Sequence, residues 1–341
     1  MPAAKSSSFY LPLVDITPFI KDPKSDAARQ VVNDVREACL STGFFQMTGH
    51  GVGPELQSAV FAAAARFFAL PTNSKLALDA KKTVGFRGYD TMGQQLYEDH
   101  VLPDLKEGFF AGQDMPTEDP RVKAGRFFMG PNVWPPAELL AARDFREPVE
   151  AYYTAMKRLC DVVLDLIAAT LPYGPHVFDG IKSNDPACPL RLLHYPPTVP
   201  ATGTGKRQLG SSAHTDFGAI TLLLQDDHAG LEVKDVDTDE WVGVPPKRDA
   251  YVVNMGDMIS RITGGLYKSS IHRVINRAPD DRYSVVFFFD GNIDYKLRPL
   301  DKAFSKDGKE IAALDADDAA PTVEQHMMER TMATYNMKGS K

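Results

Sequence analysis

The chain contains few cysteines, and their spacing offers no cross-linking pattern. Only three are present among 341 residues, Cys39, Cys160 and Cys188, and none belongs to a Cys-x-x-Cys pair. An odd and widely spaced set argues against a disulfide framework and for a reducing compartment. We therefore expect three free thiols in the core and predict a cytoplasmic protein.

Long apolar runs and an excess of basic charge are lacking as well. No stretch approaches the roughly 18 apolar residues that a membrane-spanning helix needs, and residues 1–8 contain no signal-peptide core. Lys and Arg number 38 against 45 Asp and Glu, which gives a net charge of -7. Because a nucleic-acid binder needs a basic face, we expect a small molecule as partner, and neither a nucleic acid polymer nor a membrane. The sequence leaves the oligomeric state open between a monomer and a weak dimer.

The order of apolar patterns predicts helices first and β-strands later. Helical spacing of apolar residues runs through 26–40 and 54–70, an irregular region rich in Gly, Pro and aromatics spans about 72–135, and a long helix is expected over 136–171. Short β-rich runs separated by turn residues then follow, at 190–195, 219–225, 230–233, 241–244, 251–254, 272–276 and 284–289. The tail, 322–335, is predicted to be a helix that begins with a capping box, Thr322-x-x-Gln325.

This pattern predicts a mainly β protein with flanking helices, its core an antiparallel sandwich or barrel. We expect residues 1–135 to form a helical and loop-rich N-terminal region. Residues 136–341 would contribute the long helix, the β core and the C-terminal helix.

His214-Thr215-Asp216 is the clearest candidate for chemistry. Alternate residues of a strand share a face, so both side chains could reach one metal ion. His272, in a later β-rich run, is the candidate third ligand. Two imidazoles and one carboxylate leave coordination positions open, which suits non-haem Fe(II). A His-x-Asp pair alone is a weak signal, because long chains contain such pairs by chance.

Arg282 and Ser284 follow the distal histidine and share one strand face. A guanidinium and a hydroxyl together make a good fork for a carboxylate. The alternative is an ordinary surface arginine on an edge strand.

Together these motifs resemble the 2-oxoglutarate- and Fe(II)-dependent oxygenases of the isopenicillin N synthase-like superfamily. The similarity covers nearly the whole chain. It is carried, in order, by residues 14–16, 43–45, 49–52, 190–197, 214–216, 230–233, 253–257, 270–274 and 282–284.

The resemblance implies a double-stranded β-helix, or jelly-roll, core and an enzyme that uses Fe(II), 2-oxoglutarate and O2. It implies that His214, Asp216 and His272 hold the metal. It further implies that Arg282 and Ser284, with Tyr195, bind the distal carboxylate of 2-oxoglutarate. Plant members often carry Asn at the position of Leu193, so a polar contact to the cosubstrate is in doubt there.

The expected reaction is oxidation of a C–H bond with release of succinate and CO2. Residues 106–110 and 130–135 are most similar to fungal and microbial members, which include pyrimidine methyl hydroxylases and tailoring enzymes of aromatic polyketides in secondary metabolism. We therefore expect a small, planar, oxygenated aromatic or heterocyclic substrate and oxidation of its methyl group. Desaturation, rearrangement and ring expansion remain open.

Six residues are predicted to contact the substrate. Arg191 shares a strand face with Tyr195 and could bind a substrate oxygen, with an outer ion pair as an equal alternative. Phe288 shares the strand face of Arg282 and Ser284 and should point inward. The other four come from the strand ends and the loop region: Phe217, Asn292, Phe86 and Tyr89. Each aromatic among the five could equally be plain core.

Three rival functions remain at this point. The nearest is an oxidase or cyclase of the same fold that needs no 2-oxoglutarate, which the Arg282–Ser284 pair does not exclude. A non-catalytic binding protein is disfavoured by the intact metal triad. A zinc hydrolase is disfavoured because zinc usually keeps a closed shell or a single open position.

Overall fold

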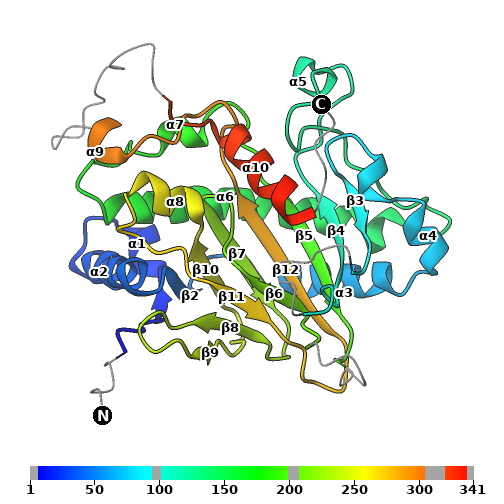
Figure 1. Cartoon of the computed structure of the whole chain (residues 1–341), viewed down its shortest axis with the longest axis horizontal. Helices are drawn as coiled ribbons and strands as arrows, with labels where there is room; N and C mark the ends of the chain where they lie inside the picture. The colour runs from blue at the N-terminus through cyan, green and yellow to red at the C-terminus, as the bar shows by residue number, and fades with distance from the viewer. Residues whose placement is uncertain (1–6, 94–100, 199–206, 304–318, 336–341) are drawn as a thin grey trace.

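Two β-sheets enclose the centre of the protein (Figure 1). The computed structural model describes residues 7–93, 101–198, 207–303 and 319–335, with the side chains of 333–335 excluded. The larger sheet has the strand order β1-β2-β10-β7-β12-β5-β4-β3, and the smaller one β6-β11-β8-β9. The strands are β1 Leu13–Asp15, β2 Phe44–Thr48, β3 Gly88–Asp90, β4 Glu107–Ala111, β5 Leu190–Tyr195, β6 Ser211–His214, β7 Ile220–Gln225, β8 Leu231–Lys234, β9 Trp241–Gly243, β10 Tyr251–Met255, β11 His272–Val274 and β12 Arg282–Phe289.

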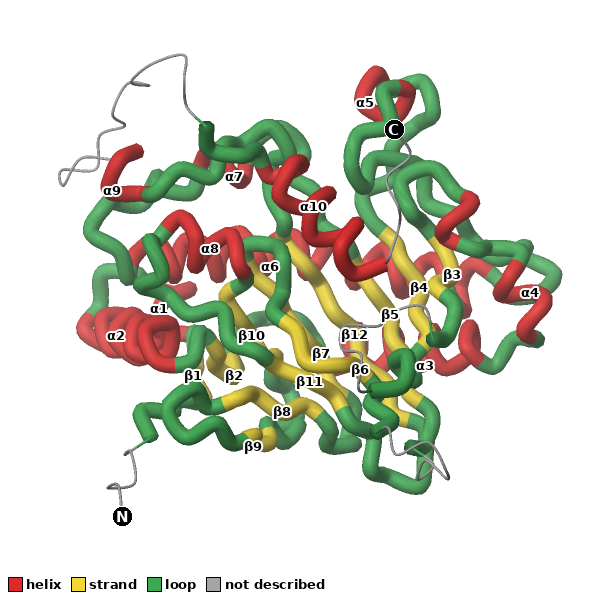
Figure 2. The backbone as a smooth tube through the Cα atoms, viewed as in Figure 1, coloured by secondary structure: helices red, strands yellow, loops and turns green. Residues whose placement is uncertain are grey.

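Helices flank the sheets and are concentrated in the first half of the chain (Figure 2). They are α1 Thr17–Lys21, α2 Asp26–Ser41, α3 Pro54–Phe68, α4 Thr72–Leu76, α5 Pro120–Lys123, α6 Arg146–Ala169, α7 Asp179–Lys182, α8 Asp257–Ile262, α9 Leu300–Ala303 and α10 Val323–Tyr335, with single 3-10 turns η1 Ala80–Lys82 and η2 Ala142–Asp144. The predicted fold class, a mainly β core with flanking helices, is confirmed.

Strand β12 shows how the sheet separates core from cavity. Its residues alternate between two faces, because successive side chains of a strand point to opposite sides. Val285, Phe287 and Phe289 pack into the main hydrophobic core, to which α3 and α6 also contribute. Arg282 and Ser284 face the opposite way, toward the space between the sheets.

Several predicted boundaries agree with the structure within two residues, including α2, α3 and β5. The capping box at α10 is also confirmed. The backbone N–H of Thr322 donates to Gln325 Oε1 at 2.9 Å, and the N–H of Gln325 donates to Thr322 Oγ1 at 3.2 Å. The three cysteines are free and buried, as expected.

Two predictions of local structure were wrong. The long helix was expected from residue 136, but α6 begins at Arg146 because turns and η2 occupy the preceding residues. The region 72–135 was expected to be irregular, yet it contains β3 and β4, which extend the larger sheet next to β5. Both strands are short and contain glycine, so their pattern is weak.

A helix that could cross a membrane does not occur in the described ranges.

Candidate active site

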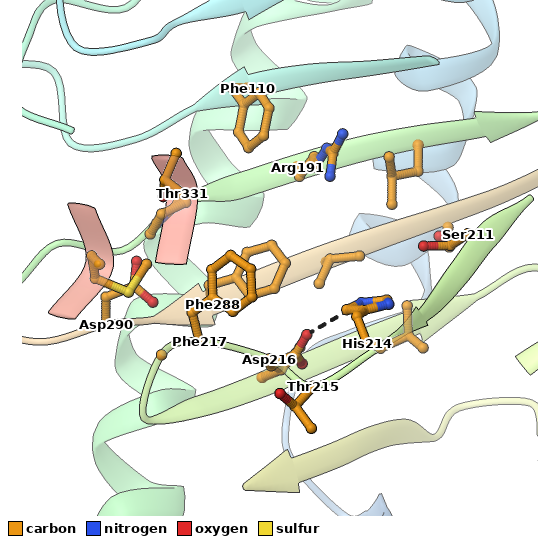
Figure 3. A pocket seen from close by; sticks show the side chains of 18 of the residues that line it. Phe110, Arg191, Ser211, His214, Thr215, Asp216, Phe217, Phe288, Asp290 and Thr331 are labelled. Atoms are coloured by element: carbon orange, nitrogen blue, oxygen red, sulfur yellow. Dashed lines mark hydrogen bonds and ion pairs between the residues drawn. The ribbon is translucent and has the colours of Figure 1, made fainter. Parts of the chain in front are cut away.

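A cavity of about 400 Å³ lies between the two sheets (Figure 3). Strands β5 and β12 form one wall, β6 and β11 form another, and the region before α6 supplies aromatic side chains. Figures 1 and 2 show α10 running across the ends of β12 and β5. Its residues Met327 and Thr331 line the cavity, so the C-terminal helix forms part of the wall.

His214, Asp216 and His272 come together at this cavity as predicted. Their candidate ligand atoms all lie within 4.8 Å of one another. Asp216 Oδ1 is 3.7 Å from His214 Nε2 and 3.5 Å from His272 Nε2. The two histidines are direct neighbours because β11 pairs with β6 in a register that places His272 opposite His214. Two imidazole nitrogens and a carboxylate oxygen converging in this way form a metal-binding triad.

One expectation about the triad was wrong in detail. His214 and Asp216 were expected to share the face of one strand, but β6 ends at His214 and Asp216 lies in the turn that follows. The turn is fixed by backbone bonds from Asp257 N to Asp216 O and from Met258 N to Gly218 O. The carboxylate reaches the histidines through this turn.

Hydrogen bonds behind the triad orient its ligand atoms. His214 Nδ1 lies 2.7 Å from Ser212 O and His272 Nδ1 lies 3.2 Å from Ser270 O, so each ring donates there and presents Nε2 to a metal. Asp216 Oδ2 accepts from Thr221 Oγ1 at 2.6 Å and from Asn254 Nδ2 at 2.8 Å. These bonds leave Oδ1 as the ligand oxygen.

The electrostatics of His214 and Asp216 suit metal binding at neutral pH, whereas Asp216 outweighs the effect of burial on His272 and raises the pKa of that imidazole. Burial and the neighbouring His272 lower the pKa of His214 to about 3, so this imidazole stays unprotonated. Burial alone would raise the pKa of Asp216, but the two histidines and the Asn254 hydrogen bond lower it well below its usual range. A neutral imidazole and an ionised carboxylate are the forms that bind a metal cation.

A second cluster lies on the same cavity wall and is formed by Arg282, Ser284 and Tyr195. Arg282 pairs directly with Tyr195 in the sheet, and its guanidinium lies 5.0 Å from the centre of the Tyr195 ring. Two of its nitrogens donate to the protein, Nε to His228 O at 3.1 Å and Nη2 to Gln225 Oε1 at 3.0 Å.

The remaining polar atoms of this cluster suit a carboxylate ligand. Arg282 and Ser284 are 0% and 1% exposed, yet Arg282 Nη1 and Ser284 Oγ have no hydrogen-bond partner within the described part of the chain. A buried donor without a partner is costly, and a carboxylate would satisfy both groups at once. The residues present therefore fit the distal end of 2-oxoglutarate.

Arg191 lines the cavity and also forms an ion pair. It therefore combines features of the two roles considered from the sequence, a substrate contact and an ion-pair residue. It is 7% exposed, and its guanidinium lies 4.7 Å from the centre of the Phe110 ring. Its Nη2 contacts Asp90 Oδ2. The pair is buried beside the cavity and holds the guanidinium in place there.

Phe217, Phe288 and Phe86 line the cavity as predicted. Phe86 and Phe128 both have a φ of 56°, a left-handed backbone conformation that bulky residues rarely adopt. Arg87 connects their loops by donating to Gly85 O and to Phe128 O, each at 2.7 Å. Strained residues of this kind are concentrated at functional sites.

Two predicted substrate contacts, Tyr89 and Asn292, are absent from the cavity lining. Tyr89 is opposite Phe109 in the β3–β4 pair and faces the core with it, where its hydroxyl donates to Glu107 Oε2 at 2.6 Å. Asn292 follows the end of β12, where strand alternation no longer applies, and its side chain donates to Ser183 Oγ at 3.1 Å. Both predictions are corrected by the geometry.

The structure adds polar cavity residues to which the sequence analysis gave no role. Lys106 Nζ donates to Asp104 Oδ2 at 2.8 Å and to Ser211 Oγ at 2.7 Å, connecting the segment before β4 to β6. Asp290 lies just beyond β12, and burial together with nearby Asp216 raises the pKa of its carboxyl to about 8. Strand parity from Arg282 could have flagged Asp290, whereas the Lys106 contacts span too much sequence to be inferred locally.

A jelly-roll core with a His-Asp-His triad and an adjoining carboxylate cradle defines a non-haem iron oxygenase. Family comparisons agree. Residues 11–137 match the model of the non-haem dioxygenase in morphine synthesis N-terminal region, and residues 186–291 match the 2OG-Fe(II) oxygenase superfamily. The chain belongs to the 2-oxoglutarate-dependent Fe(II) dioxygenases, and it uses Fe(II) and 2-oxoglutarate to oxidise a small molecule.

Individual relatives are fungal. The chain is 66% identical over 339 residues to the 2-oxoglutarate-dependent dioxygenase citB of Monascus ruber, covering 99% of each chain. It is 54% identical over 343 residues to the clavatol oxidase claD of Penicillium crustosum, covering 98% of this chain and 99% of the other.

A solved structure shares the fold. A putative 2OG-Fe(II) oxygenase family protein from Caulobacter crescentus superimposes with a TM-score of 0.75 at 28% identity, covering 96% of this chain and 99% of the other.

Proposed function

We propose that this oxygenase hydroxylates a methyl group on a small, oxygen-bearing aromatic substrate. The proposal rests on the size and the lining of the cavity. Because its volume of about 400 Å³ must also hold 2-oxoglutarate, the substrate has to be small. The cavity walls combine several phenylalanines with the buried cation Arg191. The relationship to an enzyme named clavatol oxidase also supports an oxidative role on a small molecule.

The metal and cosubstrate roles follow from the two clusters. His214, Asp216 and His272 hold Fe(II), and Arg282 with Ser284 anchors the distal carboxylate of 2-oxoglutarate. Bound iron, 2-oxoglutarate and O2 together supply the oxidising power, and succinate and CO2 are released. The protein contributes fixed ligands, since Thr221 and Asn254 already hold the other oxygen of Asp216.

The remaining residues orient the substrate. Phe217 and Phe288 flank a flat ring, with offset stacking worth about 0.5–1.5 kcal/mol beyond burial. Arg191, kept in place by Asp90, donates a hydrogen bond to a carbonyl or carboxylate oxygen. Such positioning matters because a displacement of about 1 Å can cost roughly a hundredfold in rate.

The test is a substrate-library screen with purified enzyme, Fe(II) and 2-oxoglutarate. Mass spectrometry would measure succinate and hydroxylated product in each reaction. We expect methylated, oxygen-bearing aromatics to give both in equal amounts. Product that forms without succinate would refute the proposed cosubstrate role and favour the oxidase alternative. Succinate coupled only to aliphatic substrates would refute the aromatic substrate class.

A monomeric or weakly dimeric state and a cytoplasmic location stay predictions. Light scattering across a protein dilution series and a fluorescent fusion in the source cell would test them.

A further inference from the structure

The Asp290 carboxyl is buried at the cavity without a protein partner. The residue is 1% exposed, and neither carboxyl oxygen has a hydrogen-bond partner in the ranges that the structure describes. Figure 3 shows it at one end of the cavity, with Phe217, Phe288 and Thr331 nearby. Most buried polar side chains in proteins are hydrogen-bonded, so this exception calls for an explanation.

Strand register places Asp290 on the side of the metal site away from the cosubstrate clamp. Alternate residues of β12 and its extension, from Arg282 through Ser284 and Phe288 to Asp290, all line the cavity. At about 3.3 Å per residue, Asp290 is roughly 20 Å from Ser284 along the chain. Phe288 pairs with Thr221, which binds the metal ligand Asp216, so the triad lies between these two ends.

The backbone fixes the carboxyl in this position. The Asp290 N–H donates to Ala187 O at 2.9 Å, which holds the residue beside the segment that precedes β5. The turn after Asp216 also leaves room for it, because a Cβ on Gly218 would lie 2.1 Å from Asp290 Oδ1. Any larger residue at this position would collide with the carboxyl.

Two of the cations that line the cavity pair with other carboxylates. Arg126 donates to Asp294 and Glu324, and Arg191 contacts Asp90. The neighbours of Asp290 that Figure 3 labels are two phenylalanines and a threonine. An acidic group in such surroundings, with no ion pair to explain it, suits a ligand that donates a hydrogen bond.

We propose that Asp290 recognises the substrate by accepting a hydrogen bond from a phenolic hydroxyl on its aromatic ring. The proposal rests on the proposed function and narrows the substrate class to methylated phenols. The hydroxyl points to Asp290, while the ring lies by Phe217 and Phe288. A carboxyl oxygen accepts such a bond whether the group is neutral or ionised. A ligand without the hydroxyl leaves Asp290 unsatisfied, which is how a polar site rejects an analogue.

The experiment compares three aromatic probes in anaerobic enzyme loaded with Fe(II) and 2-oxoglutarate. They are a ring-methylated hydroxyacetophenone, its methyl ether, and the analogue without the ring oxygen. Calorimetry measures their dissociation constants without turnover. We expect the phenol to bind about ten- to a hundredfold more tightly than the other two. A wild-type enzyme with no preference for the phenol overturns the proposal.

Variants of Asp290 test whether this residue causes the preference for the phenol. Asp290→Leu should bind all three probes within a few-fold of one another. Asp290→Asn retains an acceptor oxygen and should keep most of the preference. Asp179→Asn, a matched control at an exposed carboxylate on α7, should behave as wild type. The dissociation constant for 2-oxoglutarate should be unchanged in all three variants, which separates recognition from a structural role.

The outcomes also separate this proposal from the proposed function. An Asp290→Leu enzyme with the wild-type preference, alongside intact coupled turnover, overturns only the role of Asp290. A wild-type enzyme that binds 2-oxoglutarate but none of the aromatic probes overturns both. If Asp290→Leu fails to fold, Asp290→Ala removes the carboxyl without adding bulk and should lose the preference equally.

Discussion

Replacing Arg282 with glutamine should weaken 2-oxoglutarate binding strongly. The guanidinium is fully buried. Its Nε and Nη2 donate to His228 and Gln225, whereas Nη1 has no hydrogen-bond partner among the described residues. Losing one partner of a buried, charge-assisted pair costs about 2–5 kcal/mol. At about 1.36 kcal/mol per tenfold change, the dissociation constant should rise roughly thirty- to several-thousandfold.

Succinate formation measured against 2-oxoglutarate concentration gives the apparent Michaelis constant. Anaerobic calorimetry gives the dissociation constant directly. Arg277→Gln is the matched control, because Arg277 is 59% exposed and pairs with Glu232 outside the cavity. The free energy of 2-oxoglutarate binding should change by no more than about 0.5 kcal/mol in this control.

A second variant tests whether the positive charge of Arg282 is enough for 2-oxoglutarate binding or whether its planar guanidinium is also needed. Arg282→Lys keeps the positive charge but loses the planar fork, so it should recover only part of the affinity. Thermal unfolding belongs beside these assays, since both variants also disturb the bonds to His228 and Gln225. An unchanged dependence on 2-oxoglutarate in Arg282→Gln would refute the clamp and favour the cosubstrate-independent oxidase.

Three further predictions follow from the site and its surroundings. His272→Ala should abolish turnover and reduce bound iron, and a variant that still holds one Fe(II) per chain by metal analysis would contradict the triad. Arg191→Leu should impair substrate oxidation far more than 2-oxoglutarate binding and leave uncoupled succinate, and unaltered substrate kinetics would contradict its role. Burial lowers the pKa of His194, but the neighbouring carboxylates of Glu107 and Asp281 outweigh this and raise it above 6.5. Protonated His194 therefore stabilises the fold below pH 6.5, and the contribution is lost as pH rises through the raised pKa. His194→Gln should lose more stability relative to wild type near about pH 6 than near about pH 9, as measured by urea unfolding, and an equal loss at both would contradict the assignment.

Residues on one strand were the most predictable part of the site. Arg282, Ser284 and Phe288 were placed on one face from parity alone, and all three line the cavity. The same reasoning placed Arg191 beside Tyr195. It succeeded because the pleat of a strand fixes the direction of every second side chain. Asp290 obeys the same parity and could have been found with it.

Two predicted substrate contacts failed, one beyond a strand end and one in a segment with a weak pattern. Asn292 follows β12 by a few residues, yet its side chain turns to Ser183. Tyr89 belongs to a three-residue strand whose pairing with β4 directs it to the core. Neither direction follows from nearby residues, because the partner segment decides it.

The sequence by itself predicted the mainly β fold and singled out His214, Asp216, His272, Arg282 and Ser284, which the structure brings to one cavity. The tertiary structure decided which of these groups acquire partners. It alone placed Asp90 against Arg191, Lys106 against Ser211 and α10 against the cavity. It alone left Asp290 buried without a hydrogen bond in the described ranges. The physical reason is range: strand pleat and helix capping act over a few residues, whereas burial and hydrogen-bond satisfaction depend on contacts between segments distant in the chain.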